Sequence, residues 1–142
     1  MQAMISSKTV TVPTETLRKS IGVSANKARL WFKSRTQLKS REQFKTKGGL
    51  DDTRRGAVYV YFHSDGHALY VGQTGGGVKA RIHFQTAAHE KTQWWRQWTT
   101  MRFAQLKDEI DRLVLELLLI LAYKPEFNKK PGAKNLDELL PL

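Results

Sequence analysis

Hydrophobic and polar positions alternate most clearly near the centre of the chain. Residues 58–62 read VYVYF, and this two-residue period predicts a half-buried β-strand. The tripeptide at residues 64–66, SDG, then predicts a tight turn, and residues 68–72 predict a return strand. We therefore expect a β-hairpin that carries Tyr59 on one arm and Tyr70 on the other.

The pattern after the hairpin predicts a mixture of helix and strand. Residues 78–90 fit a helix, residues 101–106 fit a third strand, and Asp108 can cap a helix that runs to residue 121. Apolar residues cover nearly all faces of this last segment, which is typical of a buried helix. Pro125 ends it. We expect the α/β class in its α+β form, with a small antiparallel β-sheet flanked by helices.

Three tryptophans, at positions 94, 95 and 98, lie just before the third expected strand. Tryptophan rings stack on bases in sites that bind single-stranded nucleic acid. Spacings of one, three and four residues favour instead the burial of at least two of these rings. We expect at least two of them in the core, with base stacking as the alternative.

The N-terminal part of the chain has a helical pattern. It begins at Pro13, is interrupted at residues 21–24 and resumes over residues 25–34, where Ser24 can act as the cap. Helix, glycine-containing turn and helix together form the outline of a helix-turn-helix. A plain basic helical hairpin is the alternative. Residues 36–55 are polar and basic, which is typical of a linker or of a weak helix followed by a linker.

The net charge of +11 is unevenly distributed. Residues 1–55 hold 13 Lys and Arg against 4 acids, whereas residues 56–142 hold 11 against 9. This excess indicates a polyanionic partner, DNA first and an anionic membrane surface second, with a merely solubilising surface as the alternative. We expect a basic DNA-binding module and linker at 1–55 and a second domain at 56–142. The expected phosphate contacts lie on the second helix: Lys27, Arg29, Lys33 and Arg35.

The composition excludes several classes of protein and site. There is no Cys, which rules out a disulfide framework, Cys-ligated zinc and a thiol nucleophile. The longest apolar run, residues 113–123, is interrupted by Glu116 and is too short to cross about 30 Å of hydrocarbon. The N-terminus lacks an apolar signal core. We expect a soluble, cytoplasmic protein without a membrane partner.

Five sequence features follow one another between residues 56 and 128. They are two tripeptides that each contain a Tyr, an Arg at the start of the next helix, a Glu within an apolar helix and a Pro-x-x-Asn. In this chain they read AVY at 57–59, YVG at 70–72, Arg81, Glu116 and PEFN at 125–128. In this order the five features resemble the GIY-YIG endonuclease family.

The resemblance implies a metal-dependent endonuclease that hydrolyses phosphodiester bonds in DNA. It implies Mg²⁺ or Mn²⁺ as the cofactor, with Glu116 as the metal ligand. One Tyr would act as general base toward water, and the other would position water or phosphate. The implied catalytic residues are Tyr59, Tyr70, Arg81, Glu116 and Asn128. Gln73 and Lys79, on either side of the glycine run, are further candidates for contact with nucleic acid.

These residue types also suit the chemistry by themselves. Hydrolysis of a phosphodiester needs activated water and stabilisation of charge on the phosphoryl oxygens. One carboxylate with water and substrate phosphate is a ligand set that suits Mg²⁺, although Glu116 could instead pair with Arg112 one turn earlier. Arg81 offers a bidentate fork to phosphate or, alternatively, is simply solvated. For Tyr59 and Tyr70 the alternative is ordinary strand propensity.

Two positions depart from the commoner family pattern. Gln73 stands where many members have Lys, and Gln85 stands where many have His or Tyr. A catalytically inactive DNA-binding or regulatory protein that retains the scaffold is therefore the alternative function, and RNA processing is a third. Cutting both DNA strands with one active site per chain requires either two chains or two successive binding events. A dimer is therefore one of the expected assemblies.

Overall fold

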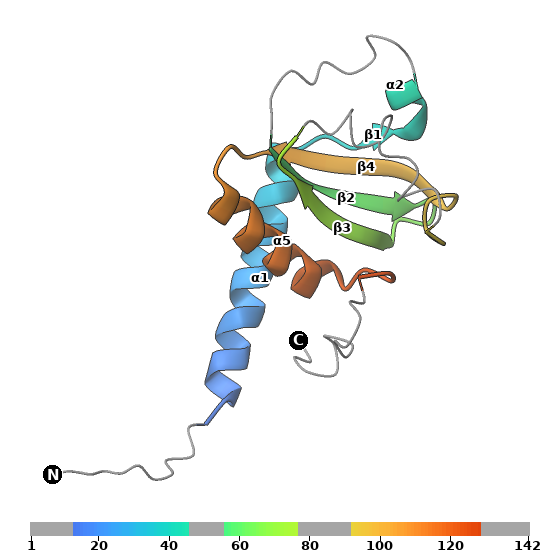
Figure 1. The fold of residues 1–142 in the computed structure, drawn as a ribbon. Helices are drawn as coiled ribbons and strands as arrows, with labels where there is room; N and C mark the ends of the chain where they lie inside the picture. Colours follow the sequence, from blue (N-terminus) through green and yellow to red (C-terminus); the bar gives the residue numbers. More distant parts are fainter. Residues whose placement is uncertain (1–12, 46–55, 77–91, 129–142) are drawn as a thin grey trace, which may run out of the picture.

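The structure, a computed structural model, describes residues 13–45, 56–76 and 92–128 (Figure 1). One four-stranded antiparallel sheet has the order β1-β4-β2-β3. The strands are β1 (Lys39–Ser40), β2 (Ala57–His63), β3 (Ala68–Thr74) and β4 (Trp98–Gln105). The described helices are α1 (Glu15–Arg35), α2 (Arg41–Lys45) and α5 (Glu109–Tyr123). The expected α+β fold with a small antiparallel sheet is confirmed, while the helix expected at 78–90 lies outside the described residues.

Strands β2 and β3 form the predicted hairpin. Tyr61 lies opposite Tyr70, and Tyr59 lies opposite Gly72. Successive side chains along a strand point to opposite faces of a sheet. The tyrosines at positions 59, 61 and 70 therefore share one face of the hairpin.

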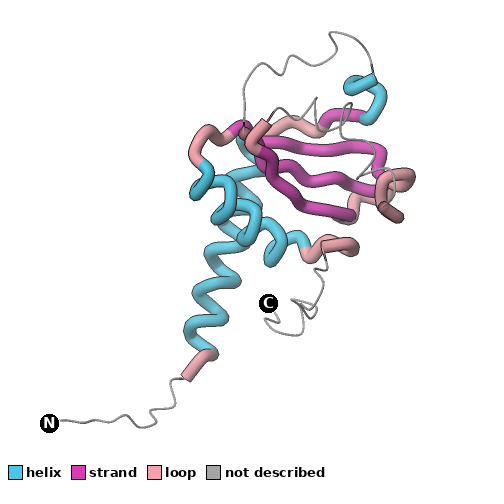
Figure 2. Tube along the Cα trace, in the orientation of Figure 1, coloured by secondary structure: helices cyan, strands magenta, loops and turns pink. Residues whose placement is uncertain are grey.

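Each face of the sheet carries its own apolar core. Helices α1 and α5 lie together on one side of the sheet (Figure 2), where the core includes Phe32, Val58, Val60, Leu115 and Leu119. The core of the opposite face is aromatic and includes Tyr59, Tyr61, Trp94, Trp95 and Trp98. All three of these tryptophans are no more than 8% exposed. The expectation that at least two belong to the core is confirmed.

Helix α1 is continuous, so the predicted break at residues 21–24 is wrong. A single helix of 21 residues replaces the two helices of the expected helix-turn-helix. A glycine inside a helix costs roughly 1 kcal/mol relative to Ala, which made Gly22 look like a helix end. The helix continues because its later turns bury Ala25 and Phe32 completely, and tertiary packing of this kind contributes most of a helix's stability.

The segment that follows α1 joins the same sheet as the rest of the chain. Lys39 and Ser40 pair with Met101 and Thr100 of β4, although residues 36–55 were expected to form a linker or a weak helix followed by a linker. Short helix α2 follows directly. Residues from the N-terminal part thus pack on both the edge of the sheet and, through Phe32 of α1, one of its cores.

Helix α5 begins as predicted and ends at Tyr123, two residues beyond the expected end at 121. The Asp108 carboxylate accepts hydrogen bonds from the backbone N–H groups of Ile110 and Asp111, at 2.8 and 3.2 Å, as an N-cap does. Lys124 adopts a left-handed conformation with φ of 49° after the last helical turn, and Pro125 follows.

The expectation that this helix is buried all round is wrong. Four apolar side chains on its outer side are between 47% and 69% exposed: Ile110, Leu113, Val114 and Leu117. Helix α5 therefore contacts the sheet and α1 with only part of its surface. Among the described residues, no helix combines the length and the apolar character needed to cross a membrane.

Candidate active site around strand β3

Tyr59 packs directly on the glycine of the second tripeptide. Its side chain is only 2% exposed, and Gly72 lies opposite it in the hairpin. A Cβ atom at position 72 would lie 2.7 Å from both Cζ and the hydroxyl oxygen of Tyr59. The phenol therefore occupies the space that any larger residue at position 72 would need, so the two tripeptides fit together sterically.

Tyr70 is the more accessible of the two candidate tyrosines. Its side chain is half-buried, and its ring stacks on that of Trp94, with centroids 4.8 Å apart and an interplanar angle of 9°. Trp94 also contacts Tyr61 with a centroid distance of 4.9 Å. The tryptophan thus supports one face of the Tyr70 ring.

Asn128 binds the backbone of β3 through both ends of its side-chain amide. Its Oδ1 accepts a hydrogen bond from the Val71 N–H at 2.7 Å, and its Nδ2 donates to the Val71 carbonyl at 2.8 Å. The backbone N–H groups of Glu126 and Phe127 donate to the carbonyls of Ala68 and Leu69 at 3.2 and 2.9 Å. Since β3 lies at the sheet edge, residues 125–128 satisfy backbone groups that an edge strand would otherwise leave unpaired.

Glu116 lies on a side of α5 that faces β3. Arg112, one turn earlier, shares its helix face and is only 8% exposed. The Nε–H of Arg112 donates to Oε1 of Gln73 in β3 at 3.1 Å, and its Nη1 donates to the carbonyls of Leu106 and Lys107 at 3.0 and 2.8 Å. Glu116 itself is half-buried.

Four of the five catalytic candidates therefore lie on β3 or beside it. Tyr70 belongs to the strand, Tyr59 contacts its glycine and Asn128 is hydrogen-bonded to it. Glu116 lies on α5, which covers the face of the sheet opposite to the two tyrosines. Arg81, with the candidate contact residue Lys79, lies outside the described residues. The amide oxygen of Gln73 is engaged with Arg112, and its contact with nucleic acid stays a prediction.

The four candidate cations of α1 are spread around the helix. Arg29 and Lys33 are one turn apart and line, with Arg102 of β4, a hollow of about 300 Å³. Lys27 and Arg35 are exposed and lie on other sides of α1, since each residue turns a helix by about 100°. The helix thus offers two separate pairs of cations rather than one basic face.

Arg41 is a partly buried cation that the sequence analysis did not single out. Its guanidinium lies over the rings of Trp95 and Trp98, 5.0 and 4.6 Å from their centroids. Its Nη1 also donates to the carbonyls of both tryptophans at 2.6 and 3.2 Å. Burial lowers the pKa of this guanidinium from its usual value. Arg41 stands out only through its contacts with tryptophans that are more than 50 residues away in the sequence. No local sequence signal therefore identifies it.

Comparison with curated proteins and with solved structures gives no match. A family model described as the UvrC-like GIY-YIG domain matches residues 55–129, which is more than half of the 142 residues. The matched range contains both tripeptides, Glu116 and the Pro-x-x-Asn segment that binds β3. The chain therefore belongs to the GIY-YIG family and carries a UvrC-like GIY-YIG domain.

Proposed function

We propose that this protein is a metal-dependent endonuclease that hydrolyses phosphodiester bonds in DNA. Family membership supports the reaction class, because GIY-YIG domains are generally nucleases. The observation that carries the proposal is the contact of three candidates with β3: Tyr70 belongs to it, Tyr59 packs on its Gly72 and Asn128 binds the Val71 backbone. Tyr70 offers a proton acceptor on one face of the sheet, and Glu116 offers a carboxylate for a metal on α5, which covers the other face.

The two tyrosines take different roles in this proposal. Tyr70 is half-buried and can meet water or a phosphate, so it is the candidate for the group that contacts the reacting atoms. Tyr59 is almost fully buried against Gly72 and acts as a positioning residue. Proton transfer requires a group within hydrogen-bond reach of its partner, which favours the accessible tyrosine.

Glu116 is the candidate metal ligand. A half-buried carboxylate fits a hard divalent cation such as Mg²⁺ or Mn²⁺, which takes one or two protein carboxylates and completes its shell with water and substrate phosphate. Such a cation, when bound, polarises the phosphoryl oxygens and lowers the pKa of coordinated water. Asn128 holds residues 125–128 against β3, the strand that carries Tyr70.

Cleavage of supercoiled plasmid DNA in the presence of Mg²⁺ or Mn²⁺ tests the proposal. Wild-type protein should nick the plasmid, and Glu116→Gln should lower the rate by roughly 10²–10³-fold, the loss typical of removing one charge-stabilising group. Glu109→Gln is the matched control, since Glu109 is an exposed acid in the first turn of the same helix. Binding of duplex DNA should be retained in both variants.

The alternative function gives a different result in the same assay. An inactive DNA-binding protein would bind duplex DNA without nicking it under either metal, and that outcome would refute the enzymatic proposal. Equal nicking by wild-type and Glu116→Gln protein would refute the metal-ligand assignment alone. Parallel reactions with structured RNA distinguish a DNA substrate from an RNA substrate.

A further inference from the structure

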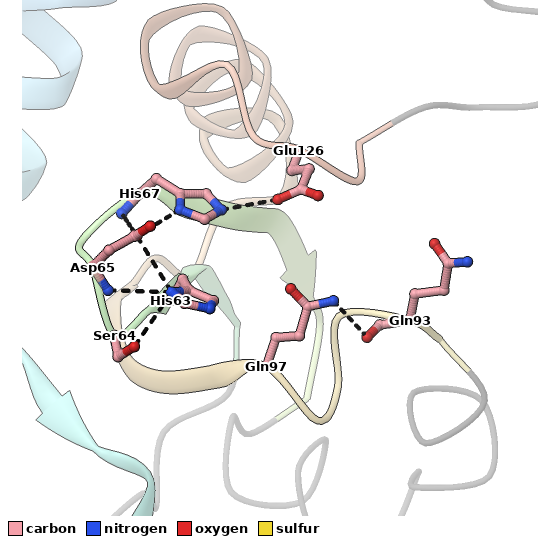
Figure 3. A network of polar contacts seen from close by, with 7 residues as sticks. All are labelled: His63, Ser64, Asp65, His67, Gln93, Gln97 and Glu126. Carbon is pink, nitrogen blue, oxygen red and sulfur yellow. Dashed lines mark hydrogen bonds and ion pairs between the residues drawn. The ribbon is translucent and has the colours of Figure 1, made fainter.

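The turn of the β2–β3 hairpin gathers three side chains with metal-binding atoms. His63 ends β2, Asp65 lies in the turn and His67 directly precedes β3. One ligand atom from each lies within 4.8 Å of the other two. The side chains are 35% to 60% exposed, so an ion can reach them. Figure 3 shows the His63 and His67 rings close to the Asp65 carboxylate at this turn.

The distances within this cluster suit a small divalent cation. Nδ1 of His63 lies 3.4 Å from Oδ1 of Asp65, and Nδ1 of His67 lies 2.5 Å from the same oxygen. In a tetrahedral zinc site each ligand is roughly 2.1 Å from the metal, which places the ligand atoms about 3.3 Å from one another. The first separation matches this value. Binding would replace two hydrogen bonds: the one between His67 and Asp65, and the one that Nδ1 of His63 accepts from the Asp65 backbone N–H at 3.2 Å.

Glu126 provides an independent observation in favour of a metal. Its Oε1 lies 2.9 Å from Nε2 of His67 (Figure 3). A histidine that binds a metal through one ring nitrogen commonly donates the other N–H to a carboxylate, which sets the tautomer and the ring orientation. Glu126 therefore holds His67 with Nδ1 directed at Asp65.

The turn itself is held in place by backbone hydrogen bonds. The backbone N–H of His67 donates to Oδ1 of Asp65, and that of Gly66 donates to the His63 carbonyl, both at 2.9 Å. Gly66 has a φ of 96°, which glycine adopts at little cost. The three candidate ligands therefore start from a preformed loop and lose little backbone freedom on binding.

We propose that His63, Asp65 and His67 form a binding site for Zn²⁺, with Glu126 orienting His67 and a water completing the tetrahedron. Two imidazoles and one carboxylate suit a borderline cation such as Zn²⁺ and differ from the oxygen ligands that Mg²⁺ prefers. The bound ion would fix the hairpin turn to residues 125–128 through Glu126. The site is separate from Glu116 and does not depend on the proposed nuclease activity.

Titration of the chelator-treated full chain with Zn²⁺, followed by calorimetry at about pH 8 where an ordinary imidazole is neutral, tests the site. His63→Gln and Asp65→Asn should each abolish or strongly weaken the binding seen with wild-type protein. Glu126→Gln should weaken it by about 10- to 100-fold, as loss of an outer partner does. In the wild type, ring proton resonances of His63 and His67 should shift at one equivalent of Zn²⁺.

Two controls make the assignment specific. A variant with His83→Gln and His89→Gln removes the other two histidines of the chain, and Glu116→Gln removes the candidate nuclease ligand. Both should bind Zn²⁺ as the wild type does. Thermal unfolding without metal verifies that each variant is folded. If His63→Gln does not fold, Asp65→Asn alone provides the test of the ligands. Undiminished binding by both ligand variants, absence of wild-type binding, or loss of binding in either control would overturn the proposal.

Discussion

The guanidinium of Arg112 donates its Nε–H to the side-chain oxygen of Gln73 at 3.1 Å, across the interface between α5 and β3. Gln73 is therefore on the sheet face that α5 covers, whereas Tyr70, three residues earlier, points to the opposite face. The position where many family members carry Lys thus lies, in this chain, next to a cation that is 8% exposed. The neutral amide of Gln73 accepts a hydrogen bond from the Arg112 cation. A Lys at position 73 would instead bring a second positive charge next to it.

Replacing Gln73 tests this relationship through stability. Gln73→Met removes the acceptor and should lower the free energy of unfolding by roughly 1.5–3 kcal/mol, the usual contribution of a hydrogen bond to a charged group. Gln73→Glu retains an oxygen and adds a charge-assisted contact, so it should match or exceed wild-type stability. Urea unfolding of the three proteins measures both effects. A Glu variant as unstable as the Met variant would contradict the role of Arg112.

The close contact between Gly72 and Tyr59 leads to a second prediction. Gly72→Ala would place a methyl group 2.7 Å from the phenol, and overpacking of this kind costs typically about 1–3 kcal/mol. Gly76→Ala is the matched control, because a Cβ atom there would lie 3.7 Å from Oγ1 of Thr74, an ordinary van der Waals contact. Chemical denaturation should show a large loss for the first variant and a small change for the second. Equal stability of the two variants would mean that the ring moves aside freely.

Local patterns were sufficient to predict the hairpin and the ends of α5. The two-residue period of residues 58–62 and the SDG turn depend only on neighbouring residues, as do the Asp108 cap and the stop at Pro125. Asn128 was named as a site residue by the family resemblance alone, without its contacts. Its physical basis, a pair of hydrogen bonds to Val71 from 57 residues away, has no local signal.

Long-range packing decided the features that the sequence analysis missed. Gly22 remains helical because Ala25 and Phe32 are buried by other elements of the fold. Those elements lie far away in the sequence, so the residues next to Gly22 give no sign of them. The exposed side of α5 was not predicted, because the Leu and Val residues along it have the same composition as its buried side. His63, Asp65 and His67 are close in sequence, but the partner that orients His67 lies 59 residues away.

The divided cations of α1 lead to a prediction about DNA affinity. Each phosphate contact contributes about 0.9 to the slope of log affinity against log salt concentration. Arg29→Gln with Lys33→Gln removes the pair beside Arg102, and Lys27→Gln with Arg35→Gln removes the exposed pair. If one pair faces DNA, its double variant should lose nearly two units of slope and the other should lose little. Unchanged slopes in both would place the DNA-binding surface elsewhere.

The last prediction concerns His67 in the metal-free protein. Hydrogen bonds that the His67 ring donates first to Glu126 and then to Asp65 raise the pKa of His67 above its usual value, against a smaller opposing effect of desolvation. The titratable groups that face it are these two carboxylates and His63. A raised folded-state pKa means that the stabilisation is complete below the unfolded-state pKa of about 6.5. It is lost as pH rises through the folded-state value.

With a chelator present, His67→Gln should therefore destabilise the protein more at pH 5.5 than at pH 8.5. The side chain is 44% exposed, so the difference should be that of an exposed ion pair, roughly 0.2–1 kcal/mol. Adding Glu126→Gln removes the largest cause of the shift and should shrink the pH dependence, because the imidazolium then retains only Asp65 as an acidic partner. Urea unfolding at both pH values measures each difference. A greater loss at pH 8.5 would mean that the neutral ring, rather than the imidazolium, makes the stabilising contacts.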